Sequence, residues 1–90
     1  MPYHILYHHK VKEDDLPAID KTIRKRIFRA IETRLMTEPE KYGAPLRKPL
    51  QGNWKLRIGD YRVVYKILKD EIWILAILHR DKVYKFVSKR

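Results

Sequence analysis

The chain has 90 residues, 44% of them hydrophobic and 36% charged, which predicts one globular domain over residues 1–90 and excludes a disordered tail. It contains no cysteine, so disulfides and thiolate chemistry are excluded. Its longest apolar run, residues 72–78, is too short for a membrane span, and its first twelve residues are not typical of a signal peptide. Twenty-one Lys and Arg against eleven Asp and Glu leave a charge of +10, which favours an anionic partner: nucleic acid, an acidic protein or an anionic membrane surface.

The first part of the chain predicts a strand followed by two helices. Residues 2–9 alternate between two side-chain faces, which is typical of a strand. Residues 10–16 favour a short helix that is interrupted near Pro17, whose ring lacks an N–H. A second helix is predicted from there to Met36, because apolar residues recur every four positions: Ile23, Ile27, Ile31 and Leu35. We interpret the arginines and lysines between them as the solvated face of that helix.

The second part predicts an antiparallel sheet. The helix ends at residues 37–39, because proline pushes the residue before it out of helical geometry, and a loop rich in glycine and proline follows. Gly59-Asp60 is a two-residue hairpin turn, and residues 83–87 can add a last short strand. The fold class is therefore α+β, a curved antiparallel β-sheet with two N-terminal helices packed on one face. Its three main strands cover residues 54–58, 61–68 and 72–79.

The hairpin turn also predicts which side chains lie opposite each other. Arg57 then pairs with Arg62 and Trp54 with Tyr65, and the alternation of side chains puts the apolar residues on one face and Lys55, Arg57 and Arg62 on the other. Directly opposed like charges cost stability. The economical explanation is a bound anion, and a phosphate suits guanidinium groups best. The alternative is that the two arginines diverge into solvent and bind nothing.

Residues 79–84 carry the other groups capable of chemistry. His79, Arg80 and Tyr84 lie where an apolar strand reaches the edge of the sheet, and together they could supply proton transfer and a phosphate clamp. A tyrosine hydroxyl has a reference pKa near 10, which nearby positive charge lowers. His79 has a reference pKa of about 6.5 that suits acid–base work at neutral pH. A polar strand end without chemistry is the alternative.

The remaining histidines and aromatic residues receive structural interpretations. His8 and His9 are expected to point to opposite faces of a strand, and no acidic or cysteine ligands join them or His4, so no metal site is predicted. Trp54 and Tyr65 are expected in the core, whereas Tyr61 beside the cations could pack there or stack on a base.

The segment LQGNWKLRIGDYRVVY at residues 50–65, followed by HRDKVY at 79–84, resembles the RelE/ParE toxin superfamily and most of all its RelE branch. The resemblance covers almost the whole chain, from the opening strand through the helices to the hairpin. It implies a RelE-like fold and a toxin of a type II toxin–antitoxin pair. Toxins of this branch enter the ribosomal A site and cut the mRNA there without a metal or cofactor: a ribose 2′-hydroxyl attacks its own phosphate and leaves a 2′,3′-cyclic phosphate.

The resemblance also implies roles for individual residues. Tyr84 would be the general base on the 2′-hydroxyl and Arg80 would assist the leaving oxygen, with His79 as a further acid–base candidate. The cations Lys55, Arg57 and Arg62 would neutralise the charge that develops in the transition state. Arg57 stands where some relatives carry lysine, and the spacing between Arg80 and Tyr84 is tighter than in some relatives. RNA binding is assigned to Arg47, Lys48, Tyr61 and Lys82.

The implied partners are an acidic antitoxin and the ribosome with its mRNA and rRNA, with no membrane and no small-molecule cofactor, in the cytoplasm. Two alternatives stay open. The first is a ParE-like inhibitor of DNA gyrase, and the second is a basic RNA-binding module without catalysis. The set of Lys55, Arg57, Arg62, Arg80 and Tyr84 favours the nuclease, because a gyrase inhibitor has no need of it.

Overall fold

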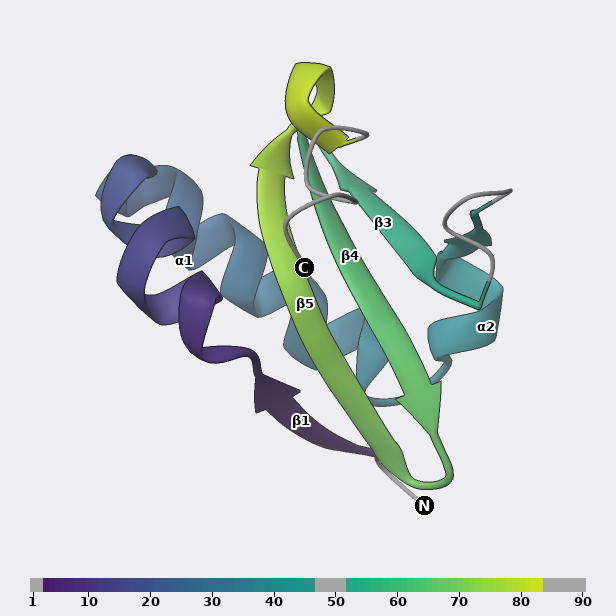
Figure 1. Ribbon diagram of the computed structural model, residues 1–90. Coiled ribbons are helices and arrows are strands. Elements are labelled where there is room, and N and C mark those ends of the chain that lie inside the picture. Colours follow the sequence, from purple (N-terminus) through teal and green to yellow (C-terminus); the bar gives the residue numbers. More distant parts are fainter. Residues whose placement is uncertain (1–2, 47–51, 84–90) are drawn as a thin grey trace.

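The computed structural model describes residues 3–46 and 52–83, in which five strands form one open sheet in the order β1-β5-β4-β3-β2 (Figure 1). Strands β3, β4 and β5 pair in antiparallel fashion, as predicted. Strand β1 lies parallel to β5, so the sheet is mixed and the expectation of a wholly antiparallel sheet was wrong. Alternation of side chains predicts which face is buried but carries no information about the direction of the neighbouring strand. The strands are His4–Tyr7 (β1), Ala44–Pro45 (β2), Trp54–Ile58 (β3), Tyr61–Leu68 (β4) and Glu71–His79 (β5).

Both predicted helical segments are present. The long one begins at the cap residue Asp20, whose Oδ2 accepts a hydrogen bond from the Thr22 N–H at 3.0 Å, and its last turn widens into π-helical geometry. No helix in the described part of the chain is long and apolar enough to cross a membrane. The helical elements are the π-helical turn Val11–Asp15 (η1), the 3₁₀ turn Leu16–Ala18 (η2), Lys21–Ala30 (α1), the π-helical turn Ile31–Leu35 (η3) and Pro39–Tyr42 (α2).

Two short elements replace the loop expected after residue 38. Pro39 starts helix α2, where the fixed φ of proline suits a first helical position, and residues 44–45 pair with β3 as the edge strand β2. The predicted break before Pro39 is confirmed. The elements that follow it span four and two residues, too few for a periodic pattern to show in the sequence.

The helices cover one face of the sheet, and the main core lies between them and the strands (Figure 1). Ile27, Ile31 and Leu35, three of the four predicted apolar helix positions, are fully buried there, and Ile23 packs partly buried against them. The buried carboxylate of Asp15 ties η1 to the sheet, because its Oδ2 accepts a hydrogen bond from the Ile77 N–H at 2.9 Å. A second, smaller cluster on the opposite face is formed by Leu46, Val64, Ala76 and Val83.

Tyr65 joins the sheet to helix α2. Its buried hydroxyl donates to the Pro39 carbonyl at 2.6 Å, and burial raises its pKa so that the donor proton is retained. The chain after α2 passes directly over this hydroxyl: a Cβ at residue 43 would overlap it, and only glycine leaves room. The φ of Gly43 is −96°, which any residue can adopt, so the requirement for glycine is one of space alone.

We expect Gly43→Ala to lower the free energy of unfolding by about 1–3 kcal/mol through overpacking. Tyr65→Phe should cost a similar ~1–3 kcal/mol, because the buried Pro39 carbonyl loses its donor. The two costs should not add, since removal of the hydroxyl relieves part of the overlap. Urea unfolding of the two single variants and the double variant measures this coupling. Fully additive costs would show that Gly43 and Tyr65 do not contact each other in solution.

The partly buried Tyr7 and the buried Tyr65 predict a loss of stability at alkaline pH. Desolvation, with a smaller contribution from Glu32, raises the pKa of Tyr7 to about 12, and the pKa of Tyr65 is raised in the same direction. The folded state holds these protons more tightly than the unfolded state, so their contribution is complete below pH ~10 and is lost as the pH rises toward 12. Tyr7→Phe should flatten the fall in unfolding free energy between pH ~10 and ~12. The same substitution at the exposed Tyr42 is the control, and equal slopes in parent and Tyr7→Phe would contradict the interpretation.

Candidate functional site

The β3–β4 hairpin has the predicted register, with Arg57 opposite Arg62 and Trp54 opposite Tyr65. Gly59 occupies the turn with φ +59°, a conformation that side-chain-bearing residues rarely adopt. The helix-facing residues Leu56 and Ile58 are buried, at 2% and 6% exposure. Because side chains alternate, Lys55, Arg57 and Arg62 belong to the other face, and we call this set with Arg80 the cationic face.

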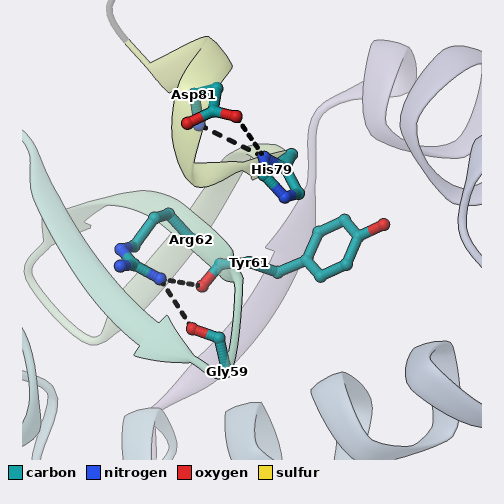
Figure 2. A network of polar contacts seen from close by, with 5 residues as sticks. All are labelled: Gly59, Tyr61, Arg62, His79 and Asp81. Carbon is teal, nitrogen blue, oxygen red and sulfur yellow. Dashed lines mark hydrogen bonds and ion pairs between the residues drawn. The ribbon is translucent and has the colours of Figure 1, made fainter.

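Arg62 is held in place by the turn itself. Its Nη1 donates to the carbonyl oxygens of Gly59 and Tyr61, each at 2.9 Å (Figure 2). These carbonyl dipoles partly neutralise the guanidinium, which explains how the sequence tolerates Arg62 opposite Arg57 without a bound anion. A guanidinium has five N–H donors, so three remain for a ligand. Arg62 is therefore pre-positioned, and most of its hydrogen-bonding capacity is free.

The cations of this face have no acidic partners within the described residues. The ion pairs found there join His4 to Asp70, Lys10 to Asp14, Lys41 to Glu38 and His79 to Asp81, and none includes a member of the cationic face. The small apolar cluster around Val64 and Ala76 lies on the same face of the sheet. Cations collected without acidic partners form a site that attracts anions.

The end of β5 returns to the hairpin and brings Arg80 with it. The Arg80 N–H donates to the Asp60 carbonyl at 2.8 Å, which places residue 80 beside the turn. Residues 80–83 form a 3₁₀ turn, drawn in yellow next to the hairpin end in Figure 1. Val83 packs into the cluster with Val64, so this turn folds back onto the cationic face. The exposed Arg80 thus lies beside the hairpin turn, and the exposed Lys82 belongs to the same 3₁₀ turn.

His79 and Tyr61 lie on the opposite, helix-covered side. The two residues are register partners, their rings meet edge to face at 5.7 Å, and the Tyr61 ring packs against the main core. Figure 2 shows the Tyr61 ring and the Arg62 side chain pointing to opposite sides of β4. The His79 Nδ1 is 3.3 Å from both the N–H and the Oδ2 of Asp81, so it has a partner whether or not it carries a proton. The structure therefore does not bring His79 or Tyr61 together with the cations.

Three of the predicted site residues, Arg47, Lys48 and Tyr84, lie outside the described residues, and so does most of the predicted strand 83–87. Val83 belongs to the 3₁₀ turn. The base assigned to Tyr84 stays a prediction.

The N-terminal histidines differ from expectation in one respect. Strand β1 ends at Tyr7, so His8 and His9 do not alternate, and their rings stack with centroids 4.4 Å apart. In residues 3–46 and 52–83, no three His, Asp or Glu side chains gather in a way that could hold a metal ion. The core assignment of Tyr65 and Trp54 is confirmed: their rings stack, and Trp54 packs against the main core.

The arginines of the long helix gather at a site that sequence reasoning missed. A hollow of about 260 Å³ lies between α1, η3 and the hairpin, and its lining includes arginines of the helix and Arg57 of β3. Helical spacing alone puts residues 26, 29, 30 and 33 on one side, but only the fold puts Arg57 and Gly59 opposite them. The lining residues are Arg26, Arg29, Ala30, Thr33, Arg34, Arg57, Ile58 and Gly59.

Residues 5–84 match the family model for the ParE toxin of type II toxin–antitoxin systems, parDE. The chain is 30% identical to the toxin RelG of Mycobacterium tuberculosis over 94% of its own length and 99% of that protein. It is 35% identical to the toxin RelE of the same organism, over 93% of this chain and 88% of that one.

Solved structures of toxin–antitoxin complexes share the fold. A chain of the RelBE2 complex from Mycobacterium tuberculosis has a TM-score of 0.82 at 29% identity, covering 89% of this chain and 93% of that chain. A chain of the RelB–RelE complex from Methanococcus jannaschii has a TM-score of 0.69 at 24% identity, covering 91% and 98%.

Proposed function

The chain belongs to the RelE/ParE superfamily of type II toxins, and from this premise we propose that it is a ribosome-dependent endoribonuclease that cuts mRNA. The observation that carries the proposal is the cationic face. Lys55, Arg57 and Arg62 lie on one side of the hairpin without acidic partners in the described chain, and Arg80 is tied to the turn beside them. An inhibitor that acts by docking alone does not require unpaired cations collected in this way.

The proposed reaction is an internal transfer at phosphorus. The 2′-oxygen of a ribose bonds to the adjacent phosphorus while the bond to the 5′-oxygen of the next nucleotide breaks, which yields a 2′,3′-cyclic phosphate and a 5′-hydroxyl. The 2′-hydroxyl loses a proton, the leaving oxygen gains one, and negative charge builds on the phosphoryl oxygens. Fixed cations aimed at such developing charge commonly make the largest contribution to catalysis. Arg62, anchored by two carbonyls, fits that task without reorganisation.

Following the resemblance, we assign removal of the 2′-proton to Tyr84 and assistance of the leaving oxygen to Arg80; the leaving oxygen takes its proton from water. Tyr84 follows Val83, which packs on the cationic face, and phenolate is favoured by nearby positive charge. Arg80 would stabilise the leaving oxygen as its charge develops. His79 is the weaker acid–base candidate, because it pairs with Tyr61 on the helix-covered side of the sheet.

We also propose that an acidic antitoxin is the cognate partner. Relatives of this fold have been solved as RelBE toxin–antitoxin complexes. A charge of +10 on 90 residues repels itself in the free chain, and a negatively charged partner removes that repulsion. The ribosome, with its rRNA and mRNA, supplies the second polyanion in this proposal.

One observation favours the gyrase alternative: the family model that matches the chain is that of the ParE toxin. A gyrase inhibitor would act by binding, and its toxicity would not depend on Arg62, Arg80 or Tyr84. An RNA-binding module without catalysis would depend on the cations for binding, but it would leave bound mRNA intact.

We expect Tyr84→Phe to lower the rate of mRNA cleavage by a factor on the order of 10² or more, with ribosome binding nearly unchanged, because only a hydroxyl is removed. Arg80→Ala should reduce the rate by ~10²-fold, equivalent to about 3 kcal/mol of transition-state stabilisation. Primer extension on translated mRNA measures both. EDTA should have no effect, and His79→Gln should reduce the rate less than either variant. Tyr42→Phe, which removes a hydroxyl from an exposed tyrosine, is the matched control.

The pattern among these variants separates the hypotheses. If Tyr84→Phe cleaves at the parental rate while Arg80→Ala is inactive, the base is misassigned and His79 is the next candidate. If all variants remain as toxic as the parent, the nuclease proposal is wrong, and supercoiling by purified gyrase becomes the assay to run.

Arg62 and Arg57 should respond differently to a charge-conserving change. Arg62→Lys removes the geometry that spans two carbonyl oxygens, so its charge is no longer held in place and cleavage should fall about tenfold or more. Arg57 makes no such hydrogen bonds within the described residues, and Arg57→Lys should retain most activity. Single-turnover cleavage at saturating ribosomes gives the comparison. Equal reductions in the two variants would mean that the anchoring of Arg62 is irrelevant to the reaction.

A further inference from the structure

The hollow beside the hairpin is part of a longer cationic surface along helix α1. A second hollow, of about 510 Å³, is lined by Lys21, Thr22, Lys25, Arg26 and Arg29. Arg26 and Arg29 line both hollows, so the two hollows adjoin each other. We call the combined surface the helix trough; its cationic residues are Lys21, Lys25, Arg26, Arg29, Arg34 and Arg57, all exposed.

The trough carries no acidic residue among its described lining. Between residues 21 and 37 the chain has one carboxylate, Glu32. Glu32 is not among the residues that line the trough. The ion pairs of the described residues do not include any of the trough cations. The charge of the trough is thus uncompensated within the described chain.

Arg26 of helix α1 reaches the hairpin turn. A Cβ at residue 59 would lie 3.5 Å from Nη1 of Arg26, so the Arg26 guanidinium extends over the hairpin turn. Arg57, on β3, lines the trough while belonging to the cationic face. The trough therefore begins where the proposed reaction site ends and leads away from it along the helix.

We propose that the helix trough binds the sugar-phosphate backbone of structured RNA and docks the toxin without taking part in the cleavage step. This inference rests on the proposed function in taking the polyanion to be RNA. The cations run from Lys21 to Arg34, about 20 Å of helix at ~1.5 Å per residue, which suits a polymer with regularly spaced charges better than a single small anion.

The lining favours nucleic acid over an acidic protein. Protein interfaces have an apolar centre with aromatic or aliphatic anchors, whereas interfaces with nucleic acid are more polar and more positive. The apolar residues of the trough, Ala30 and Ile58, are buried, at 8% and 6% exposure. The large hydrophobic residues exposed in the described chain, Tyr42 and Leu68, do not line it. The trough therefore presents guanidinium and ammonium groups to a partner, without an exposed aromatic or large aliphatic residue among its described lining.

The test uses Arg26→Gln/Arg29→Gln, which removes the two arginines that both hollows share. Lys12→Gln/Lys69→Gln removes the same charge from exposed positions outside the trough and is the matched control.

Binding to an RNA duplex of about 20 base pairs is measured by fluorescence anisotropy over a series of KCl concentrations. The trough variant should bind about tenfold more weakly or worse, and its slope of log K against log salt should fall by about 2, because each arginine that binds a phosphate adds roughly one to that slope. Arg26→Lys/Arg29→Lys should restore the slope.

Cleavage on ribosomes supplies an independent readout. The trough variant should need a higher ribosome concentration for half-maximal cleavage, with an unchanged rate at saturation, since neither arginine belongs to the cationic face. If the parent and the variants all fail to cleave, the proposed function is wrong, while the duplex experiment still tests the inference about the trough.

In the duplex experiment, a slope of log K against log salt equal to that of the control variant would overturn the inference. So would a variant that binds the duplex normally but no longer binds a poly-glutamate peptide, which would identify the trough as a protein interface.

Discussion

The register of the β3–β4 hairpin is the constraint on which the rest of the structure depends. With Gly59-Asp60 as a two-residue turn, Leu56 and Ile58 enter the core and Arg57 is exposed. A slip of one residue would exchange the two faces, leaving two large aliphatic side chains in water and burying a guanidinium. Each aliphatic side chain contributes about 1.5–3 kcal/mol by burial, and a buried unpaired charge costs more than that. The force that builds the core therefore also collects the cations on the opposite face.

Three elements converge on this turn and use its backbone. The Gly59 carbonyl accepts from the Arg62 side chain, the Asp60 carbonyl accepts from the Arg80 N–H, and Arg26 of helix α1 extends over Gly59. Carbonyl groups at a hairpin end otherwise face water, so these contacts take no hydrogen bond away from the sheet. They also tie the Arg62 side chain and the Arg80 backbone to the same two-residue turn. The geometry of the cationic face is thus a property of the turn.

Much of this arrangement could be predicted from the sequence, because the patterns involved are local. The hairpin needs only a Gly-Asp pair between alternating strands, and the helix needs only its four-residue repeat ending before Pro39. What could not be predicted depends on long-range packing. The parallel pairing of β1 with β5 joins segments more than about 60 residues apart, and short elements such as α2 and β2 carry no period. The stacking of His8 on His9 follows from where β1 ends, and strand ends are poorly determined by alternation.

The helix arginines show most clearly why the functional surfaces could not be predicted from local sequence patterns. A basic stripe on an amphipathic helix is usually a solvated face, and its sequence is the same whether or not another element lies across from it. Here the hairpin lies across from it, and Arg57 belongs to both the helix trough and the cationic face. The two surfaces therefore meet at one residue and act on their partners through overlapping fields, since exposed charges interact over about 8–10 Å at moderate salt. Under the proposed function, a ribosome that carries both rRNA and mRNA neutralises the two surfaces together, whereas an acidic antitoxin bound to either surface weakens the attraction for that ribosome.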